Sequence, residues 1–158
     1  MGQGCDMIVS LYTLPEEEKL PEGLSIKRAF PADKERILSF VEDHFQKNWI
    51  YETEHALMQA VPRCFIVTED HEVLGFACYD VSAKSFFGPI GIVPDRRGEG
   101  IGKALLLHTL YAMKADGYGY GIIGWVDEAA SFYQKTVGAR FIEGAKPENS
   151  VYQRMIRF

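Results

Sequence analysis

Apolar residues recur along the chain with two periods, which predict an alternation of strands and helices. Residues 24–30 alternate between apolar and polar side chains, as a half-buried strand does. Residues 33–45 instead place Ile37, Leu38, Val41 and Phe45 on one helical face. The same criteria predict helices over 49–60, 99–115 and 127–136, strands over 64–68, 73–81, 86–93, 120–126, 139–143 and 151–158, and a short strand within 7–14.

The predicted order is β-α-α-β-β-β-α-β-α-β-β after the short N-terminal strand. We therefore expect a single α/β domain with a mixed, mostly antiparallel sheet of six to seven strands and about four helices. The polar turn at 69–71 would join two strands into a hairpin, and Gly88, Pro89 and Gly91 predict a bulge or edge in the strand over 86–93. Residues 15–23 are charged and proline-flanked, so residues 1–23 form an N-terminal extension and linker in this prediction, and 24–158 the domain.

Composition narrows the class of protein. The 158 residues are 47% hydrophobic and 25% charged, as in a globular domain, and the net charge of −5 argues against nucleic acid or an anionic membrane as partner. No stretch reaches the ~18 consecutive apolar residues of a membrane span. The chain has three cysteines, an odd number, without CxxC spacing, so we expect no disulfide framework. This favours a reducing, cytoplasmic location. Cys64, His71 and Cys78 have no fourth partner, so no metal is expected.

Three alternating glycines, Gly98, Gly100 and Gly102, lie between an apolar strand and an apolar helix. The first turn of a helix has N–H groups without internal acceptors, and the helix dipole adds positive potential there. Glycine lets a ligand approach this backbone closely. Arg97 and Lys103 flank the loop, which therefore predicts an anion site, with phosphate as the usual ligand.

Two common phosphate-binding motifs do not fit this loop. A P-loop requires glycine where Arg97 stands and Ser or Thr where Ala104 stands. A dinucleotide fingerprint requires a third glycine where Lys103 stands. A formal match over 119–124 follows a helix and lies within a predicted strand, which is the wrong context for that mechanism.

The run from Arg97 to Gly102 resembles the Arg/Gln-x-x-Gly-x-Gly signature of the GNAT superfamily of acyl-CoA-dependent N-acetyltransferases. The similarity extends from Val93-Pro94 to Ala104-Leu105-Leu106, and the predicted order of elements is also that of the family. The resemblance implies that the loop backbone holds the pyrophosphate of acetyl-CoA. The cofactor-binding residues that it implies are Ile92, Val93, Arg97, Gly98, Gly100, Ile101, Gly102, Lys103 and Ala104.

A second segment, from Trp125 to Phe141, resembles the family signature in which Phe-Tyr-x-Lys precedes a glycine. The tyrosine of that signature, which protonates the departing thiolate in many members, corresponds to Tyr133. A phenol suits this role because its pKa of about 10 is close to that of a thiol. Asp127 departs from the asparagine common in the family, and we expect it to cap the following helix.

The resemblance also implies that the strand over 86–93 separates from its neighbour and that N–H groups near Ile92 and Val93 polarise the thioester. An ammonium must lose a proton before it attacks, so a general base is expected. The candidate bases are Glu52, Glu54, His55, Asp80 and Glu128. The candidate pocket walls are Trp49, Tyr79, Phe87 and Trp125, with Tyr51 and Phe86 as further aromatic candidates.

The expected function is transfer of an acetyl group from acetyl-CoA to the primary amine of a small molecule by direct attack, with Tyr133 as the acid. A non-catalytic CoA-binding sensor and a peptide or protein N-acetyltransferase are the alternatives. We expect no nucleic acid or membrane partner, and a homodimer by analogy with the family.

Overall fold

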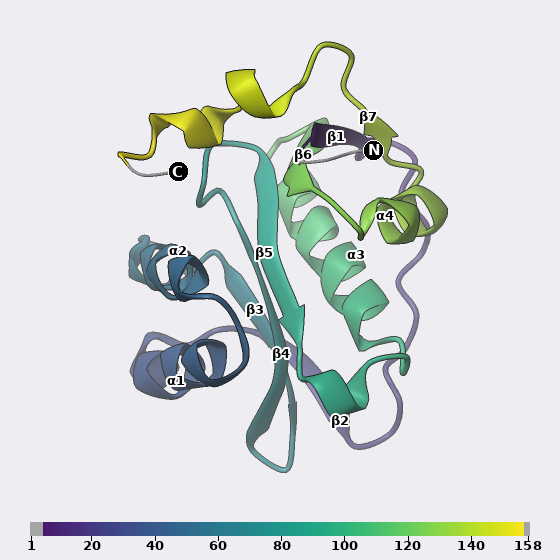
Figure 1. The fold of residues 1–158 in the computed structure, drawn as a ribbon. Coiled ribbons are helices and arrows are strands. Elements are labelled where there is room, and N and C mark those ends of the chain that lie inside the picture. The colour runs from purple at the N-terminus through teal and green to yellow at the C-terminus, as the bar shows by residue number, and fades with distance from the viewer. Residues whose placement is uncertain (1–4, 157–158) are drawn as a thin grey trace.

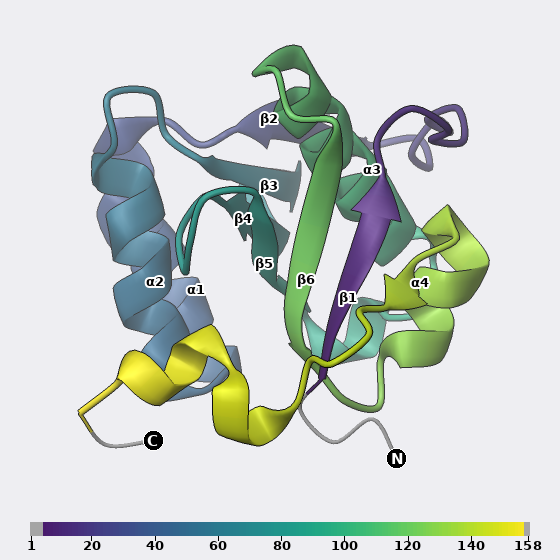
Figure 2. The same ribbon diagram turned by 90° about the horizontal axis from the view of Figure 1, so that it is seen from above.

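A computed structural model describes residues 5–156 of the chain. Seven strands form one sheet in the order β2-β3-β4-β5-β6-β1-β7, with α1 and α2 on one face and α3 and α4 on the other (Figures 1 and 2). All pairings are antiparallel except that of β5 with β6. The predicted fold class is confirmed.

The elements have the following bounds. The strands are β1 (Cys5–Ser10), β2 (Leu24–Arg28), β3 (Cys64–Glu69), β4 (Glu72–Tyr79), β5 (Phe86–Ile92), β6 (Tyr120–Val126) and β7 (Arg140–Phe141). The helices are α1 (Lys34–His44), α2 (Lys47–Met58), α3 (Ile101–Ala115) and α4 (Ala130–Val137). Short 3-10 turns, η1 (Pro31–Asp33), η2 (Pro94–Arg96), η3 (Pro147–Asn149) and η4 (Val151–Arg154), complete the fold.

The N-terminal strand is an internal member of the sheet. The short strand that we predicted within residues 7–14 is β1, which pairs with β6 on one side and with β7 on the other. Its side chains at Met7, Val9 and Leu11 are fully buried against the α3 side. The apolar character of this segment therefore reflects a strand in the core.

The core consists of two layers separated by the sheet. One cluster packs α3 and α4 against one face, and the other packs α1 and α2 against the opposite face. In the second cluster the Phe45 ring meets Phe76 at a centroid distance of 5.6 Å and Trp49 at 5.4 Å. The same ring lies over Gly91 of β5, where a Cβ would come within 2.5 Å of it. Gly91 thus permits the close approach of the α1–α2 connection to β5.

Strands β5 and β6 separate soon after they begin. Their parallel pairing joins only Phe86 to Ile122 and Phe87 to Ile123. Beyond this point Pro89 has no N–H to donate, and the register of β5 with β4 shifts between Ala77 and Tyr79. The two strands then diverge, as Figure 1 shows. The irregularity predicted from the glycines and proline is present.

Two predicted features are wrong. The structure has no strand over 151–156; instead η3 and η4 form, because Pro147 opens one 3-10 turn and the Ser150 Oγ accepts the Tyr152 N–H at the start of the next. Asp127 does not cap α4: the N-cap is Ala129, and the Ala130 N–H donates to the Asp127 carbonyl rather than to its side chain.

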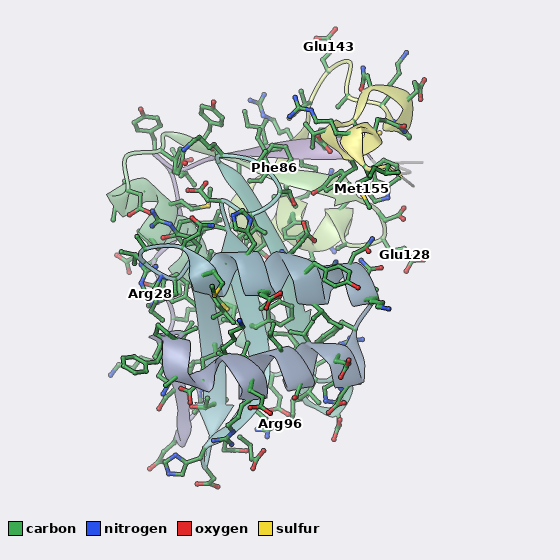
Figure 3. All side chains as sticks on the ribbon, turned by 90° about the vertical axis from the view of Figure 1, so that its left-hand side faces the viewer. Arg28, Phe86, Arg96, Glu128, Glu143 and Met155 are labelled. Atoms are coloured by element: carbon green, nitrogen blue, oxygen red, sulfur yellow. The ribbon has the colours of Figure 1, made fainter. Side chains whose placement is uncertain are left out.

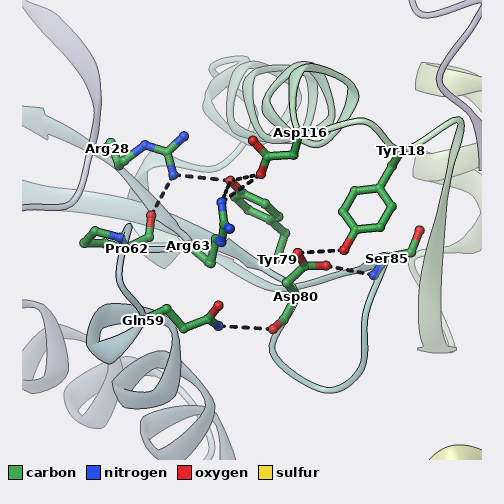
Figure 4. Close-up of polar contacts among 9 residues, drawn as sticks. All are labelled: Arg28, Gln59, Pro62, Arg63, Tyr79, Asp80, Ser85, Asp116 and Tyr118. Atoms are coloured by element: carbon green, nitrogen blue, oxygen red, sulfur yellow. Dashed lines mark hydrogen bonds and ion pairs between the residues drawn. The ribbon is translucent and has the colours of Figure 1, made fainter.

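A polar network around the buried Tyr79 side chain fastens the C-terminal end of α3 to β3 and β4. The Tyr79 hydroxyl donates to Asp116 at 2.9 Å and accepts from Arg63 at 3.0 Å and from Arg28 at 3.3 Å (Figure 4). Arg63 also pairs with Asp116 at 2.8 Å. The Tyr79 side chain is fully buried, and burial of its hydroxyl without hydrogen-bond partners would destabilise the folded state. These three residues supply the partners.

The contact of Phe45 with Gly91 gives a stability prediction. Gly91→Ala should lower the free energy of unfolding by about 1–3 kcal/mol, because the added methyl overlaps a ring already enclosed by other aromatics. Gly102→Ala is the control. The added methyl would lie 3.7 and 3.8 Å from its nearest neighbours, which is ordinary van der Waals contact, and the substitution replaces a glycine within a helix. Urea unfolding curves compare the variants. Equal stability of Gly91→Ala and wild type would contradict the prediction.

Candidate functional site

The glycine loop has the conformation that an anion site requires. Gly98 and Gly100 have φ of 86° and 84°, in the left-handed region that only glycine adopts without strain. A Cβ at either position would meet no atom within 4 Å, so backbone conformation rather than lack of space requires glycine there. Since Gly100 is left-handed, α3 begins at Ile101 rather than at the predicted Glu99.

The backbone donors at the start of α3 are free of intrahelical partners. The Ala104 N–H donates to the Gly100 carbonyl at 3.0 Å and is the first N–H of the helix ladder. The N–H groups of Ile101, Gly102 and Lys103 precede it and have no acceptor within the helix. The Ala104 N–H, which we expected to bind the ligand, is therefore already used within the helix. The N–H groups of Ile101, Gly102 and Lys103 remain suited to bind a phosphate.

Charged side chains brace the loop. The Arg96 guanidinium contacts Glu69 at 2.7 Å and Glu99 at 3.0 Å, and these hydrogen bonds, with that to Glu69 first, raise its pKa. The Arg97 Nε donates to the Ile92 carbonyl at 3.3 Å. Lys103, in the first turn of α3, pairs with Glu18 of the N-terminal linker at 2.6 Å. Arg96 thus connects the loop to the end of β3, while Lys103 presents a cation at the helix start.

The end of β5 offers alternate backbone groups to the gap. The Val93 N–H donates to the Leu74 carbonyl at 2.8 Å, so it belongs to the ladder with β4, and our expectation that it is free is corrected. Because N–H groups of a strand alternate in direction, those of Ile92 and Ile90 face away from β4, toward the side on which β6 has diverged. Ile90 was not among the predicted residues, since only the register identifies it.

Three elements meet at Gly102. A Cβ there would lie 3.7 Å from Ile92 Cγ1 of β5 and 3.8 Å from Phe132 Cζ of α4. The first turn of α3, the end of β5 and α4 therefore converge at one point. Two segments that are distant in the sequence, the glycine loop and the Phe132-Tyr133 pair, are brought together here.

Tyr133 is a buried phenol beside this convergence. Its side chain is 6% exposed, and its ring meets those of Phe87 at 6.3 Å and Phe132 at 5.2 Å. Within residues 5–156 its hydroxyl makes no hydrogen bond. Burial raises the pKa of Tyr133 to about 12. The phenol is therefore protonated at neutral pH and has a proton to donate.

The four predicted pocket residues lie in different places. Phe87 contacts Tyr133, and Trp125 lies at the end of β6 with its ring 6.2 Å from that of Tyr152. Trp49, in the first turn of α2, packs against the rings of Phe45 and Phe76. Tyr79 belongs to the network at the far end of α3. The structure brings the first two to the separation of β5 and β6, whereas Trp49 is partly buried against the α1/α2 core cluster and Tyr79 is fully buried.

The candidate bases also differ in their surroundings. The Glu54 carboxylate pairs with Lys34 at 3.1 Å, and that of Asp80 accepts from the Ser85 N–H and the Tyr118 hydroxyl. His55 and Glu128 are exposed. Glu52 accepts a hydrogen bond of 2.5 Å from the Ser82 hydroxyl, which in turn accepts from Tyr152 at 3.2 Å.

Among residues 5–156, no three His, Cys, Asp or Glu side chains are grouped as metal ligands would be. No helix in that part of the chain is long and apolar enough to cross a bilayer. A cavity of about 780 Å³ lies between β1, the C-terminal half of α4 and residues 12–15, and no residue of the glycine loop lines it.

The raised pKa of Tyr133 predicts a pH dependence of stability. The phenol ionises near pH 10 in an unfolded chain but at about 12 in the folded protein, so the folded state is favoured below pH 10 and loses this advantage between pH 10 and 12. Wild type should lose about 2–3 kcal/mol more over this range than Tyr133→Phe, as measured by urea unfolding. Tyr12→Phe, at a ring 79% exposed, is the control. Parallel curves for wild type and Tyr133→Phe would contradict the prediction.

Comparison with known proteins agrees with this geometry. Residues 61–136 match the family model of the acetyltransferase (GNAT) domain, a range that contains both the glycine loop and Tyr133. No curated protein matches the sequence of the chain.

Solved structures share the fold at low sequence identity. A GCN5-related glucosamine N-acetyltransferase region of a fungal multi-domain β-N-acetylglucosaminidase is 17% identical, with a TM-score of 0.69 over 88% of this chain and 20% of that one. A GCN5-related N-acetyltransferase from Sphaerobacter thermophilus is 19% identical, with a TM-score of 0.69 over 87% and 48%. One from Kribbella flavida is 16% identical, with a TM-score of 0.63 over 87% and 54%.

This chain thus spans from a fifth to about half of the length of these neighbours. Their likeness concerns the fold alone. The family match over 61–136, with the separated β5 and β6 strands and the glycine loop at the start of α3, supports the GNAT superfamily as the family of this chain.

Proposed function

We propose that the protein is an N-acetyltransferase that moves the acetyl group of acetyl-CoA to the primary amine of a small molecule. The observation that carries this proposal is the convergence at Gly102, where an anion-binding helix start lies against the α4 segment that bears Tyr133. A phosphate site alone would suit many ligands. A phosphate site close to a buried, protonated phenol suits a thioester whose leaving group needs a proton.

The residues present fit acetyl-CoA, which supplies an activated acetyl group on a thioester when bound. The free N–H groups of Ile101, Gly102 and Lys103 would hold the pyrophosphate, and the Lys103 ammonium would add charge. The Ile92 and Ile90 N–H groups, which face away from β4, would bind the amides and polarise the thioester carbonyl. These contacts would place the sulfur toward Tyr133.

Tyr133 would act as the general acid. Its apolar surroundings raise its pKa, which makes it a weaker acid in isolation. The same surroundings destabilise a thiolate and raise its affinity for a proton, so the two groups remain matched. Attack by the neutral amine would then proceed without a covalent enzyme intermediate, since Cys64 and Cys78 are fully buried on the other face of the sheet.

The direct test is a binding and turnover experiment. Acetyl-CoA should raise the melting temperature because it binds the folded state, whereas ATP and NAD should not. Thiol release should then occur with at least one amine from a panel of 2-phenylethylamine, putrescine, glucosamine and a peptide with a free N-terminus. Binding without turnover would favour a CoA-binding sensor, and turnover of the peptide alone would favour a peptide acetyltransferase. Stabilisation by ATP or NAD instead would overturn the proposal.

The role of Tyr133 gives a kinetic prediction. Tyr133→Phe keeps the ring packing with Phe87 and Phe132 but removes the proton, so kcat should fall about 100-fold or more while KM for acetyl-CoA changes little. Tyr12→Phe, far from the loop, should keep the wild-type kcat. If Tyr133→Phe retains full kcat, another group protonates the thiolate.

The contact of Glu18 with Lys103 gives a binding prediction. Glu18 competes with the cofactor phosphates for the Lys103 ammonium, so Glu18→Gln should lower the Kd for acetyl-CoA by about two- to fivefold, as an exposed ion pair allows. Glu16→Gln is the control, because Glu16 makes no ion pair within the described residues. Calorimetry at low salt measures both, and the difference should shrink at high salt. A weaker affinity for Glu18→Gln would contradict the prediction.

A further inference from the structure

The segment after β7 covers the sheet where β5 and β6 separate. There η4 places Tyr152 over Gly124 of β6: a Cβ at Gly124 would lie 2.7 Å from the Tyr152 Oη and 3.0 Å from Phe86 Cε2. In Figure 3, Phe86 and Met155 lie at the same end of the α1/α2 face, and Arg96 lies at the opposite end. Tyr152 therefore lies next to the first residues of β5, where its pairing with β6 ends.

The two sides of this junction carry different tyrosines. Successive side chains of a strand point to opposite faces. Phe87 meets Tyr133 on the α3/α4 face, whereas Phe86 lies with Tyr152 on the face that α1 and α2 cover. A group that enters between β5 and β6 thus has one tyrosine on each side of the sheet.

Tyr152 is the first member of a hydrogen-bonded chain. Its hydroxyl donates to Ser82 Oγ at 3.2 Å, and the Ser82 hydroxyl donates to Glu52 Oε2 at 2.5 Å. These three residues come from η4, from the connection between β4 and β5, and from α2. All three are partly buried rather than fully exposed or enclosed. A chain of hydroxyls that ends on a carboxylate can carry a proton in one direction.

The Glu52 carboxylate, at the end of this hydrogen-bonded chain, has no cationic partner among the described residues. Glu52 pairs with no Lys, Arg or His within residues 5–156, unlike its neighbour Glu54, which pairs with Lys34. Structural carboxylates are commonly neutralised by such pairs. An unpaired carboxylate reached through two hydroxyls is suited to accept a proton.

We propose that Tyr152, Ser82 and Glu52 form a proton relay that deprotonates the amine acceptor, which binds on the α1/α2 face of the β5–β6 junction against Trp125 and Phe86. This inference rests on the proposed acetyl transfer and specifies its acceptor side. The acceptor class is a primary amine with an apolar body. Its ammonium would lie at the Tyr152 hydroxyl and its body against the aromatic rings.

The proton balance is as follows. The ammonium gives one proton to Tyr152 Oη while the phenol proton moves to Ser82 Oγ and the Ser82 proton moves to Glu52. The carboxylate becomes a carboxylic acid, and both hydroxyls are restored. The amine lone pair then forms the N–C bond as the C–S bond breaks. Tyr133 protonates the thiolate, the second nitrogen proton leaves to solvent, Glu52 releases its proton to solvent and Tyr133 regains one.

The electrostatics of Tyr152 support this arrangement. Burial raises the pKa of its phenol, as do the Glu52 and Asp6 carboxylates that face it, whereas the hydrogen bond with Ser82 lowers it. The phenol therefore stays protonated at neutral pH and passes a proton on rather than losing it. The Asp6 carboxylate has a hydrogen-bond partner of its own, because its Oδ1 accepts from the backbone N–H of Trp125 at 2.9 Å.

The test compares pH profiles of kcat/KM with 2-phenylethylamine as acceptor. Wild type captures the ammonium and deprotonates it, whereas Glu52→Gln must capture the neutral amine from solution. At pH 7, kcat/KM of Glu52→Gln should be about 100-fold below that of wild type. It should rise about tenfold per pH unit, because the concentration of neutral amine rises in the same way. The difference from wild type should therefore shrink by pH 9. Tyr152→Phe and Ser82→Ala should show the same steeper slope. Glu54→Gln, the matched control two residues away on α2 at a carboxylate that pairs with Lys34, should follow wild type.

A second measurement is independent of turnover. Alkaline difference spectra of the cofactor-free protein, taken against Tyr152→Phe, report the Tyr152 phenol. Its pKa should fall in Glu52→Gln and rise in Ser82→Ala, because the carboxylate raises it and the Ser82 hydrogen bond lowers it. An unchanged Tyr152 titration in both variants would overturn the relay as a connected chain.

The kinetic outcomes separate the two proposals. If no amine of the panel is acetylated, the proposed function fails. If glucosamine is acetylated but 2-phenylethylamine is not, the apolar acceptor class is overturned, and the pH profiles are measured with glucosamine. If turnover occurs and Glu52→Gln keeps the wild-type rate and slope, the relay is overturned while the acetyltransferase function stands.

Discussion

The short parallel contact between β5 and β6 determines how this molecule can work. Only two residue pairs join these strands, so the sheet is continuous at one end and divided at the other. A longer ladder would satisfy the Ile90 and Ile92 backbone groups within the sheet and leave nothing to pair with a ligand. The divided end also allows α3 and α4 to approach β5 at Gly102, which brings the glycine loop to the segment that carries Tyr133. Both the anion site and the buried acid therefore depend on where one pairing stops.

The elements that the sequence predicted well are those with their own local signals. The apolar periods located every helix, and the polar turn at 69–71 became a tight hairpin with Asp70 and His71 in left-handed conformations. The glycine loop was predicted because Gly98, Gly100 and Gly102 alternate between an apolar strand and an apolar helix. Features that depend on register were not accessible: whether the Val93 N–H is free follows from its partner Leu74, which no local pattern specifies. Tyr79 looked like a pocket residue because aromatic character alone does not reveal that Arg63 and Asp116 engage its hydroxyl.

The ends of the described chain were the hardest to predict, for a physical reason. Residues 151–156 include apolar side chains that suit a strand, but Pro147 and the Ser150 hydroxyl favour tight turns instead. The result is more specific than a strand, since it places Tyr152 on Gly124. Similarly, the acidic linker after β1 lies along α3, where Glu18 meets Lys103 and Glu17 meets His108 at 2.9 Å. The C-terminal segment thus contacts β6 on one face of the sheet, and the linker contacts α3 on the other face.

The position of β1 has a consequence for how the protein is made. This strand is synthesised before its partners β6 and β7, which lie more than a hundred residues later in the chain. Until residues 120–126 and 140–141 have been synthesised, Met7, Val9 and Leu11 have no sheet to join. Closing so long a loop makes folding slow and leaves an apolar segment waiting in solution. The nascent chain should therefore be most dependent on chaperones before β7 emerges, and the sheet should be completed only after residues 140–141 have been synthesised.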